Sequence, residues 1–228
     1  GRVWRDIDRK LNRQDEAQCA KAASILARVK RLLEQKPKDK NKLYSLHAPE
    51  VECISKGKAR QPYEFGVKVT VATTHKEGLV VGMRSMPGNP YDGHTLPEAI
   101  EQVSILTAQK PKAVFVDKGY RGVSVDGVTI WRSGQKRGVT PSIRKAIHRR
   151  SAVEPAIGHM KNDGKLRRNW LKGSLGDALN AVLCGAGHNL RMILRAIRLF
   201  CVWMLCFSMA DNERCPSQHA EFRGMATP

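Results

Sequence analysis

Two carboxylates, Asp117 and Glu154, lie in sequence settings that could support chemistry. Asp117 follows the short apolar run 113–116, which is typical of a buried strand, and it precedes a glycine turn. Open α/β sheets place their binding sites at that end of a strand, although Asp is also common in ordinary turns. Glu154 is one of two acidic residues among 12 Lys and Arg in residues 132–172. It is therefore either simply paired with a cation or placed there for a function.

The neighbours of Glu154 allow two interpretations. Ser151 and Glu154 have the spacing of a capping box, in which Glu154 would only fix the start of a helix. Alternatively, Arg150, Glu154 and Lys161 follow one another at intervals of four and seven residues, which places them on one face of a continuous helix. Pro155 argues against a helix that runs unbroken back to Arg150.

Carboxylates in a basic setting could hold divalent cations beside bound phosphates. Two or three of them holding a pair of cations can cut and join phosphodiesters, because one cation activates the attacking hydroxyl and the other stabilises the leaving oxygen. Mg²⁺ suits a ligand set made only of oxygen, and Lys and Arg would hold the phosphate backbone. The candidate metal ligands are Asp117 and Glu154, and the candidate DNA-binding residues are Arg149, Arg150, Lys161, Lys165, Arg167 and Arg168.

The overall charge also favours a polyanionic partner. The chain has 228 residues with 40 Lys and Arg against 21 Asp and Glu, a net charge of +19. More than half of that charge, +10, lies in residues 132–172, and another +7 lies in residues 1–45. Nucleic acid is the first expectation and an acidic membrane surface the second, with a merely soluble basic protein as the plain alternative. A hydrophobic content of 41% supports a real core, whereas 6% aromatic residues weakens any interpretation based on base stacking.

Neither a zinc site nor a membrane span is indicated. The six cysteines form no Cys-x-x-Cys pair and no Cys/His cluster with zinc-finger spacing, so we expect reduced thiols in a cytosolic protein. The longest apolar run, residues 199–210, is too short for a bilayer, which needs about 20 residues.

The hydrophobic pattern predicts an α/β layered domain that positions these groups. We expect a helix over 6–35, a basic linker, strands over 65–70 and 79–83 joined by a hairpin loop at 74–78, a helix over 96–108, strands over 113–116 and 128–131, helical pieces over 141–170 and a long helix over 177–206. Asp92 or Thr95 is the expected N-cap of the helix over 96–108.

The residues resemble the DDE transposases of bacterial insertion sequences, in the subgroup with a Tyr-x2-Arg-x3-Glu-x6-Lys signature. Arg150, Glu154 and Lys161 reproduce the Arg, Glu and Lys spacing, and Ile147 stands at the Tyr position. The stretches that look similar to the subgroup over about residues 1–200 are 44–54, 86–94, 116–122 and 133–137.

The resemblance implies a ribonuclease-H-like fold, a mixed sheet flanked by helices, with a helical N-terminal extension and C-terminal helices. It implies Mg²⁺-dependent cleavage of DNA strands at element ends followed by strand transfer. Asp117 and Glu154 would be the second and third catalytic carboxylates, and Arg150 and Lys161 would contact phosphates near the scissile bond. The implied partner is double-stranded DNA, at element ends and target, rather than a membrane. A homodimer on that DNA, in a bacterial cytoplasm, is compatible with the resemblance.

The main departure concerns the first Asp of the family. Residues 1–35 look like the end of a helical insertion that follows the family's first strand, so we expect a chain truncated before that Asp. Asp6 and Asp8 are weak substitutes for it. The expected division is 1–43 as insertion and linker, 44–206 as catalytic domain and 207–228 as an irregular tail. The alternatives are a DNA-binding remnant without catalysis and, more distantly, an unrelated basic structural protein.

Overall fold

The computed structural model describes the whole chain except residues 1, 12–15, 56, 58, 61 and 214–228. It has a mixed α/β architecture, as predicted, but the described strands form three two-stranded sheets and not one continuous sheet. In chain order the elements are α1 (Arg2–Leu11), α2 (Glu16–Glu34), β1 (Glu52–Ser55), β2 (Tyr63–Gly66), β3 (Lys68–Thr73), β4 (Val80–Met86), α3 (Asp92–Thr107), β5 (Ala113–Val116), β6 (Thr129–Arg132), α4 (Pro141–Arg149), the 3₁₀ turn η1 (Arg150–Ala152), α5 (Val153–Asn162) and α6 (Gly173–Glu213).

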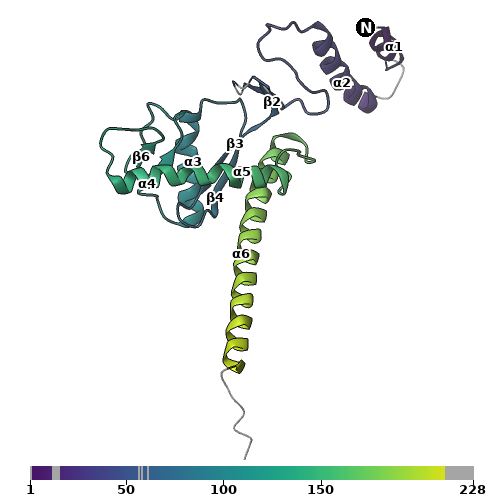
Figure 1. Ribbon diagram of the computed structural model, residues 1–228. Coiled ribbons are helices and arrows are strands. Elements are labelled where there is room, and N and C mark those ends of the chain that lie inside the picture. The colour runs from purple at the N-terminus through teal and green to yellow at the C-terminus, as the bar shows by residue number, and fades with distance from the viewer. Residues whose placement is uncertain (1, 12–15, 56, 58, 61, 214–228) are drawn as a thin grey trace, which may run out of the picture.

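The N-terminal helices α1 and α2 replace the predicted helix 6–35 and lie apart from the rest of the molecule (Figure 1). The loop that follows α2 is tied back to it. Gln35 exchanges hydrogen bonds with the backbone N–H and C=O of Leu43 at 2.9 and 2.8 Å, and Leu43 is buried. These contacts hold the basic linker against the helix that precedes it.

The single strand predicted over 65–70 is wrong, because the chain changes sheets at Gly66. That residue has a φ of +151°, a backbone conformation open to glycine and closed to most residues. β2 therefore pairs antiparallel with β1, a strand that the hydrophobic pattern did not predict, whereas β3 pairs antiparallel with β4. The predicted hairpin between β3 and β4 is confirmed, and Thr74 N–H closes it on Leu79 O at 2.8 Å.

One core cluster lies between α3 and the parallel pair β5 and β6. Its buried members are Leu96, Ile100 and Val116. The hydrophobic pattern predicts that α3 begins at Leu96, but the helix begins at Asp92. No side chain caps its N-terminus. The predicted capping role of Asp92 is therefore wrong, since its carboxylate pairs with Lys68 instead.

The helical segments α4, η1 and α5 follow one another as an almost continuous rod (Figure 1). Thr140 caps the start of α4 by accepting a hydrogen bond from Ile143 N–H at 3.3 Å. The tighter η1 turn precedes Pro155, where proline lacks an N–H and its ring would clash with the carbonyl four residues earlier in a regular helix. The capping-box interpretation is wrong, because Ser151 Oγ donates to His148 O and Glu154 pairs with Arg150.

The second core cluster joins β4, α5 and the first half of α6, with Met83, Met160, Ala181 and Cys184 buried together. Helix and strand approach closely here, because a Cβ at Gly185 would lie 3.0 Å from a methyl carbon of Val80.

The second half of α6 leaves the body and projects away from it (Figure 1). The helix continues to Glu213, beyond the predicted start of an irregular tail at 207, and residues 214–228 lie outside the described part. No helix in the described ranges is long and apolar enough to cross a membrane. No disulfide joins any two described cysteines, and Cys215 is not among them.

Candidate active site

Asp117 directly follows β5, at the carboxyl end of that strand, as predicted from the sequence. Its Oδ1 accepts a hydrogen bond from the N–H of Lys118 at 2.7 Å, and its carbonyl accepts one from Tyr120 N–H at 3.2 Å. This tight turn fixes the carboxylate at the strand end while leaving 59% of the side chain exposed. The group is thus anchored by backbone and open to a ligand.

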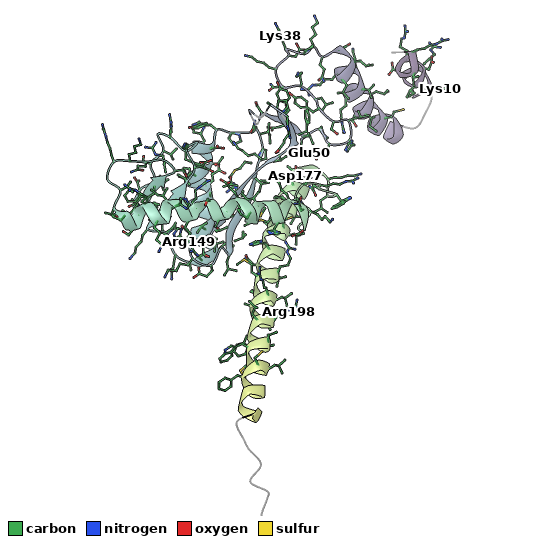
Figure 2. All side chains as sticks on the ribbon, viewed as in Figure 1. Lys10, Lys38, Glu50, Arg149, Asp177 and Arg198 are labelled. Carbon is green, nitrogen blue, oxygen red and sulfur yellow. The ribbon has the colours of Figure 1, made fainter. Side chains whose placement is uncertain are left out.

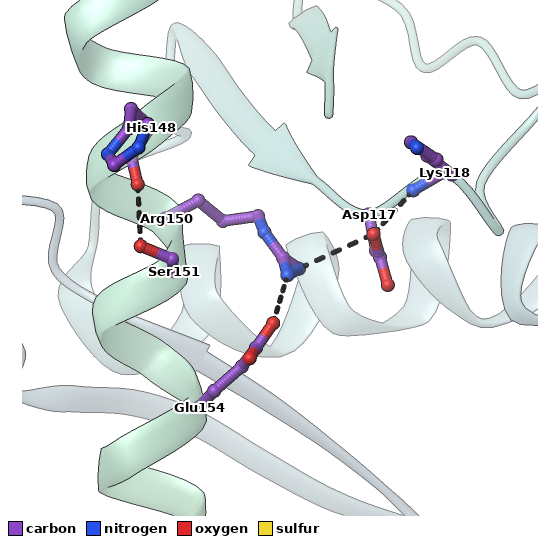
Figure 3. Close-up of polar contacts among 6 residues, drawn as sticks. All are labelled: Asp117, Lys118, His148, Arg150, Ser151 and Glu154. Atoms are coloured by element: carbon purple, nitrogen blue, oxygen red, sulfur yellow. Dashed lines mark hydrogen bonds and ion pairs between the residues drawn. The ribbon is translucent and has the colours of Figure 1, made fainter. Parts of the chain in front are cut away.

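Arg150 connects the two predicted carboxylates (Figure 3). Its Nη1 lies 3.8 Å from Asp117 Oδ1, and its Nη2 donates to Glu154 Oε1 at 3.0 Å. The Arg150 side chain is only 18% exposed, whereas Asp117 and Glu154 are 59% and 70% exposed. Two carboxylates from separate elements therefore face one half-buried guanidinium, with their remaining oxygens toward solvent.

The donor set fits a hard divalent cation in its chemistry. Mg²⁺ prefers oxygen ligands and is often held by one or two carboxylates together with waters and substrate phosphates. Asp117 and Glu154 could supply such ligands, and Arg150 now compensates their negative charge. Within the ranges that the structure describes, no three His, Cys, Asp or Glu side chains are grouped closely enough to hold a metal ion.

A third carboxylate, Asp92, lies beside the turn that follows Asp117. Its Oδ1 is 2.6 Å from Lys68 Nζ, which also donates to Pro90 O at 2.6 Å. A Cβ at Gly119 would come within 2.7 Å of Asp92 Oδ2, so a larger residue at position 119 would require the Asp92 carboxylate to move. Asp92 and Lys68 therefore belong to the surroundings of the strand end.

Tyr120 is affected electrostatically by both Asp92 and Asp117. Burial raises the pKa of its hydroxyl; Asp92 and Asp117 raise it further, whereas a hydrogen bond with Thr95 and the charge of Arg150 lower it. The hydroxyl therefore stays protonated at neutral pH and can donate a hydrogen bond. Sequence reasoning missed Tyr120, Asp92 and Lys68 as site neighbours, although Tyr120 and Asp92 lie in stretches that carry the family resemblance.

A match to a protein-family model identifies the domain that contains this site. The model described as "Transposase DDE domain" matches residues 34–186. The chain belongs to this transposase family. The matched range includes Asp117, Arg150 and Glu154, so the cluster lies within the transposase domain. No curated protein and no solved structure matches the chain.

The other predicted DNA-binding residues lie in two regions of the transposase domain, along the rod of α4 and α5 and in the turns after α5. Arg149 is engaged with the hairpin between β3 and β4, because its Nε donates to His75 O at 2.8 Å and its Nη2 donates to Lys76 O. Lys161 Nζ lies 3.7 Å from Glu64 Oε2 of β2. Arg149 therefore ties the rod of α4 and α5 to the hairpin loop, and Lys161 ties it to β2.

Lys165, Arg167 and Arg168 lie in the turns between α5 and α6 and are exposed. The Arg168 guanidinium lies over the Trp170 ring, 5.7 Å from its centroid. These three cations do not contact the carboxylates in any ion pair of the described residues, and they form a basic surface beyond the end of α5. Their role in binding DNA stays a prediction.

The weak substitutes for the first Asp lie elsewhere in the transposase. Asp6 pairs with Arg9 at 3.9 Å within α1, and Asp8 lies on the same helix. Figure 1 places α1 at the opposite end of the molecule from β6 and α4. Neither residue is near Asp117 or Glu154.

Proposed function

We propose that this chain is the DNA transposase of an insertion sequence, which cleaves DNA strands at the ends of its element and joins them to target DNA with Mg²⁺. The carrying observation is that Asp117 and Glu154, from separate elements of a transposase domain, meet on either side of Arg150. The reaction belongs with DNA in a bacterial cytoplasm, and two copies on the DNA would serve the two ends of an element.

A ribonuclease-H-like arrangement of the strands is part of the proposal. In its support, α3 packs against β3 and β4 and also against Val116 of β5. One helix thus covers two of the two-stranded sheets, as the flanking helix of a larger mixed sheet would.

The chain's own residues divide the work of the reaction. Asp117 and Glu154 would hold Mg²⁺, which when bound activates the attacking hydroxyl and stabilises the leaving oxygen. Arg150 holds the two carboxylates in place and carries the charge that a scissile phosphate would meet. The Tyr120 hydroxyl, protonated at neutral pH, would donate to an anionic oxygen at the strand end.

The basic side chains would bind the phosphate backbone on both sides of that point. Lys165, Arg167 and Arg168 extend the positive surface beyond α5, while Arg149 and Lys161 lie along the rod itself. Neutralising several phosphates at once releases counterions, so the affinity for DNA should fall steeply as salt is added.

The test is nicking of a supercoiled plasmid that carries the DNA flanking the gene for this chain. With Mg²⁺ the unmutated chain should produce nicked circles, and Asp117→Asn should produce none. Asp126→Asn is the matched control, because Asp126 is an exposed turn residue between Val125 and Val128 and removes the same charge. Equal nicking by both variants would contradict the role of Asp117.

A second candidate is a transposase remnant that binds DNA without cutting it. It is favoured by one observation, that only two carboxylates meet at Arg150 among the described residues. Plasmid binding by the unmutated chain, with no nicks in Mg²⁺ or Mn²⁺, would decide for this candidate against the first.

A further inference from the structure

The stretch 133–137, which carries part of the family resemblance, directly follows β6. β5 and β6 run parallel and end at the same edge, with Val116 aligned with Arg132. Ser133 N–H extends this pairing by donating to Val116 O at 2.9 Å. The turn after β6 therefore lies beside Asp117, at the end of the strands where α/β sheets place their binding sites.

Gln135 holds this turn in a defined shape. Its backbone N–H donates to Arg132 O at 3.1 Å, and its side-chain Nε2 donates to Arg137 O at 3.2 Å. Its Oε1 accepts a hydrogen bond from Arg132 N–H at 3.4 Å. Gly134 has a φ of +79°, a left-handed conformation that glycine adopts without steric cost. One side chain thus connects both ends of a turn that presents bare glycine backbone.

Lys118 lies against the bare backbone of Gly134. A Cβ at position 134 would lie 3.1 Å from Lys118 Cε and 3.9 Å from its Nζ, so a side chain there would push the lysine away. Lys118 directly follows Asp117, and Figure 3 shows Lys118 and Arg150 on opposite sides of Asp117. The absence of a side chain at Gly134 therefore gives the lysine a place beside the candidate metal ligand.

The two cations beside Asp117 differ in their partners. Arg150 is 18% exposed and pairs with both Asp117 and Glu154. Lys118 is exposed, and its ammonium forms no ion pair with any residue that the structure describes. Residues 127–153 contain seven Lys and Arg and no Asp or Glu. The Lys118 ammonium is therefore available to an anion that reaches the ends of β5 and β6.

A lysine ammonium is a compact charge with three donors, which suits the non-bridging oxygens of a phosphate. We propose that Lys118, seated on the turn at Gly134, binds a phosphate of the DNA strand that is cut, on the side of Asp117 away from Arg150. Lys118 would thereby position that strand against the carboxylates, and Gly134 would act through Lys118. This site rests on the proposed function, since DNA is its ligand.

The first test measures binding without a divalent cation, by fluorescence anisotropy of a labelled duplex from the DNA that flanks the gene for this chain. Lys118→Gln should weaken binding at least about tenfold, because a hydrogen bond between charged groups is lost. Lys112→Gln removes the same charge from an exposed position at the opposite end of β5, and it should bind as the unmutated chain does. Equal weakening in both variants would overturn the site.

The second test separates displacement of Lys118 from backbone strain. Gly134→Ala should lower the affinity at least about threefold, because a charge-assisted hydrogen bond weakens when its donor is displaced. Gly138→Ala is the matched control. Gly138 has a φ of +69°, and a Cβ there would meet no other part of the described structure within 4 Å. Thermal melts should show similar losses of stability in both variants. An equal loss of affinity in Gly138→Ala would overturn the role of Gly134.

A double-mutant cycle tests whether Gly134 acts through Lys118. In the Lys118→Gln background, Gly134→Ala should cause no further loss of affinity, because the side chain that it displaces no longer carries a charge. Lys118→Arg keeps the charge and should bind better than Lys118→Gln. Independent losses that add in the double variant would overturn the coupling between the two residues.

Plasmid nicking in Mg²⁺ at saturating chain concentrations tests the positioning role. Lys118→Gln should still nick at least about tenfold more slowly, because a misplaced strand reacts slowly even when it is bound. Normal nicking at saturation would overturn the positioning role. A chain that binds the duplex through Lys118 and does not nick would contradict only the proposed reaction, whereas a chain that binds no DNA would contradict both.

Discussion

α5 and α6 use the same core but present different faces to their surroundings. Met160 of α5 packs together with Ala181 and Cys184 of α6 in one buried cluster. The exposed surface of α5 carries charged side chains such as Glu154, which lies beside Arg150, whereas the exposed surface of α6 carries many large apolar side chains. Two helices that pack into one core can therefore bind different partners, because the side chains on the exposed face of each helix decide what it can bind.

The charged face should be the more sensitive of the two in a nicking assay. Replacing Glu154 by Gln removes the proposed metal ligand and keeps the size of the side chain. We expect the nicking rate to fall at least about 1000-fold, because metal-ion catalysis contributes several kcal/mol and about 1.4 kcal/mol is tenfold. Glu101→Gln, at an exposed position of α3, is the control and should nick normally. A Glu154→Gln variant within tenfold of the control would remove Glu154 from the chemistry.

The shared core should govern stability. Met160 is fully buried, so Met160→Ala should lower the free energy of unfolding by about 2–5 kcal/mol. Leu199→Ala, on the exposed outer face of α6, should change it by less than about 0.5 kcal/mol. Urea unfolding followed by circular dichroism measures both. Similar losses for the two variants would mean that the face, and not the core, stabilises α6.

The exposed arginines in the turns between α5 and α6 should contribute to DNA binding. Arg167→Gln with Arg168→Gln should weaken plasmid binding and reduce the slope of log affinity against log salt by about 2, since each phosphate contact contributes about 1. Lys110→Gln with Lys112→Gln removes the same charge at the opposite end of β5. Fluorescence anisotropy over a salt series should show no change of slope in that control. An equal change in both pairs would indicate a response to net charge alone.

The smallest effect on stability is expected from Asp177, near the start of α6. Asp177 accepts a hydrogen bond from Asn169 at 2.8 Å, and Figure 2 shows it close to Glu50. Burial raises the pKa of the Asp177 carboxyl; the Asn169 hydrogen bond lowers it and Glu50 raises it. Because the folded pKa exceeds the unfolded one, the ionised form is penalised at neutral pH, and this penalty is lost as pH falls through the folded pKa.

Asp177→Asn should therefore raise the melting temperature slightly at about pH 7, and the gain should shrink toward about pH 4 as Asp177 takes up its proton. Thermal melts of the variant and the unmutated chain at both pH values measure this difference. Asp163→Asn is a control on the α5 side, at an exposed residue that pairs with His159. A gain that grows on acidification would contradict the expected sign.

Local patterns predicted much of the fold and the two central carboxylates. The apolar run 113–116 forms β5, and Asp117 lies at its end as expected, because a short buried strand followed by a glycine turn is a local property of the chain. Glu154 was found through its basic surroundings. The division of residues 63–73 into two strands escaped prediction, since alternating hydrophobicity continues across Gly66 while the backbone at that glycine turns the chain into another sheet.

Partnerships between distant residues escaped prediction for a different reason. Asp92 could be interpreted as a cap from its neighbours alone, yet Lys68 of another element takes its carboxylate. Likewise, the spacing along α6 is set by the sequence, but which face the body would cover depended on how α6 packs against β4. Local periodicity thus determined the elements and the residue types on each face. Only the tertiary structure decided that Arg150 lies between Asp117 and Glu154 and that much of the apolar surface of α6 stays exposed, because both follow from long-range packing that no local pattern encodes.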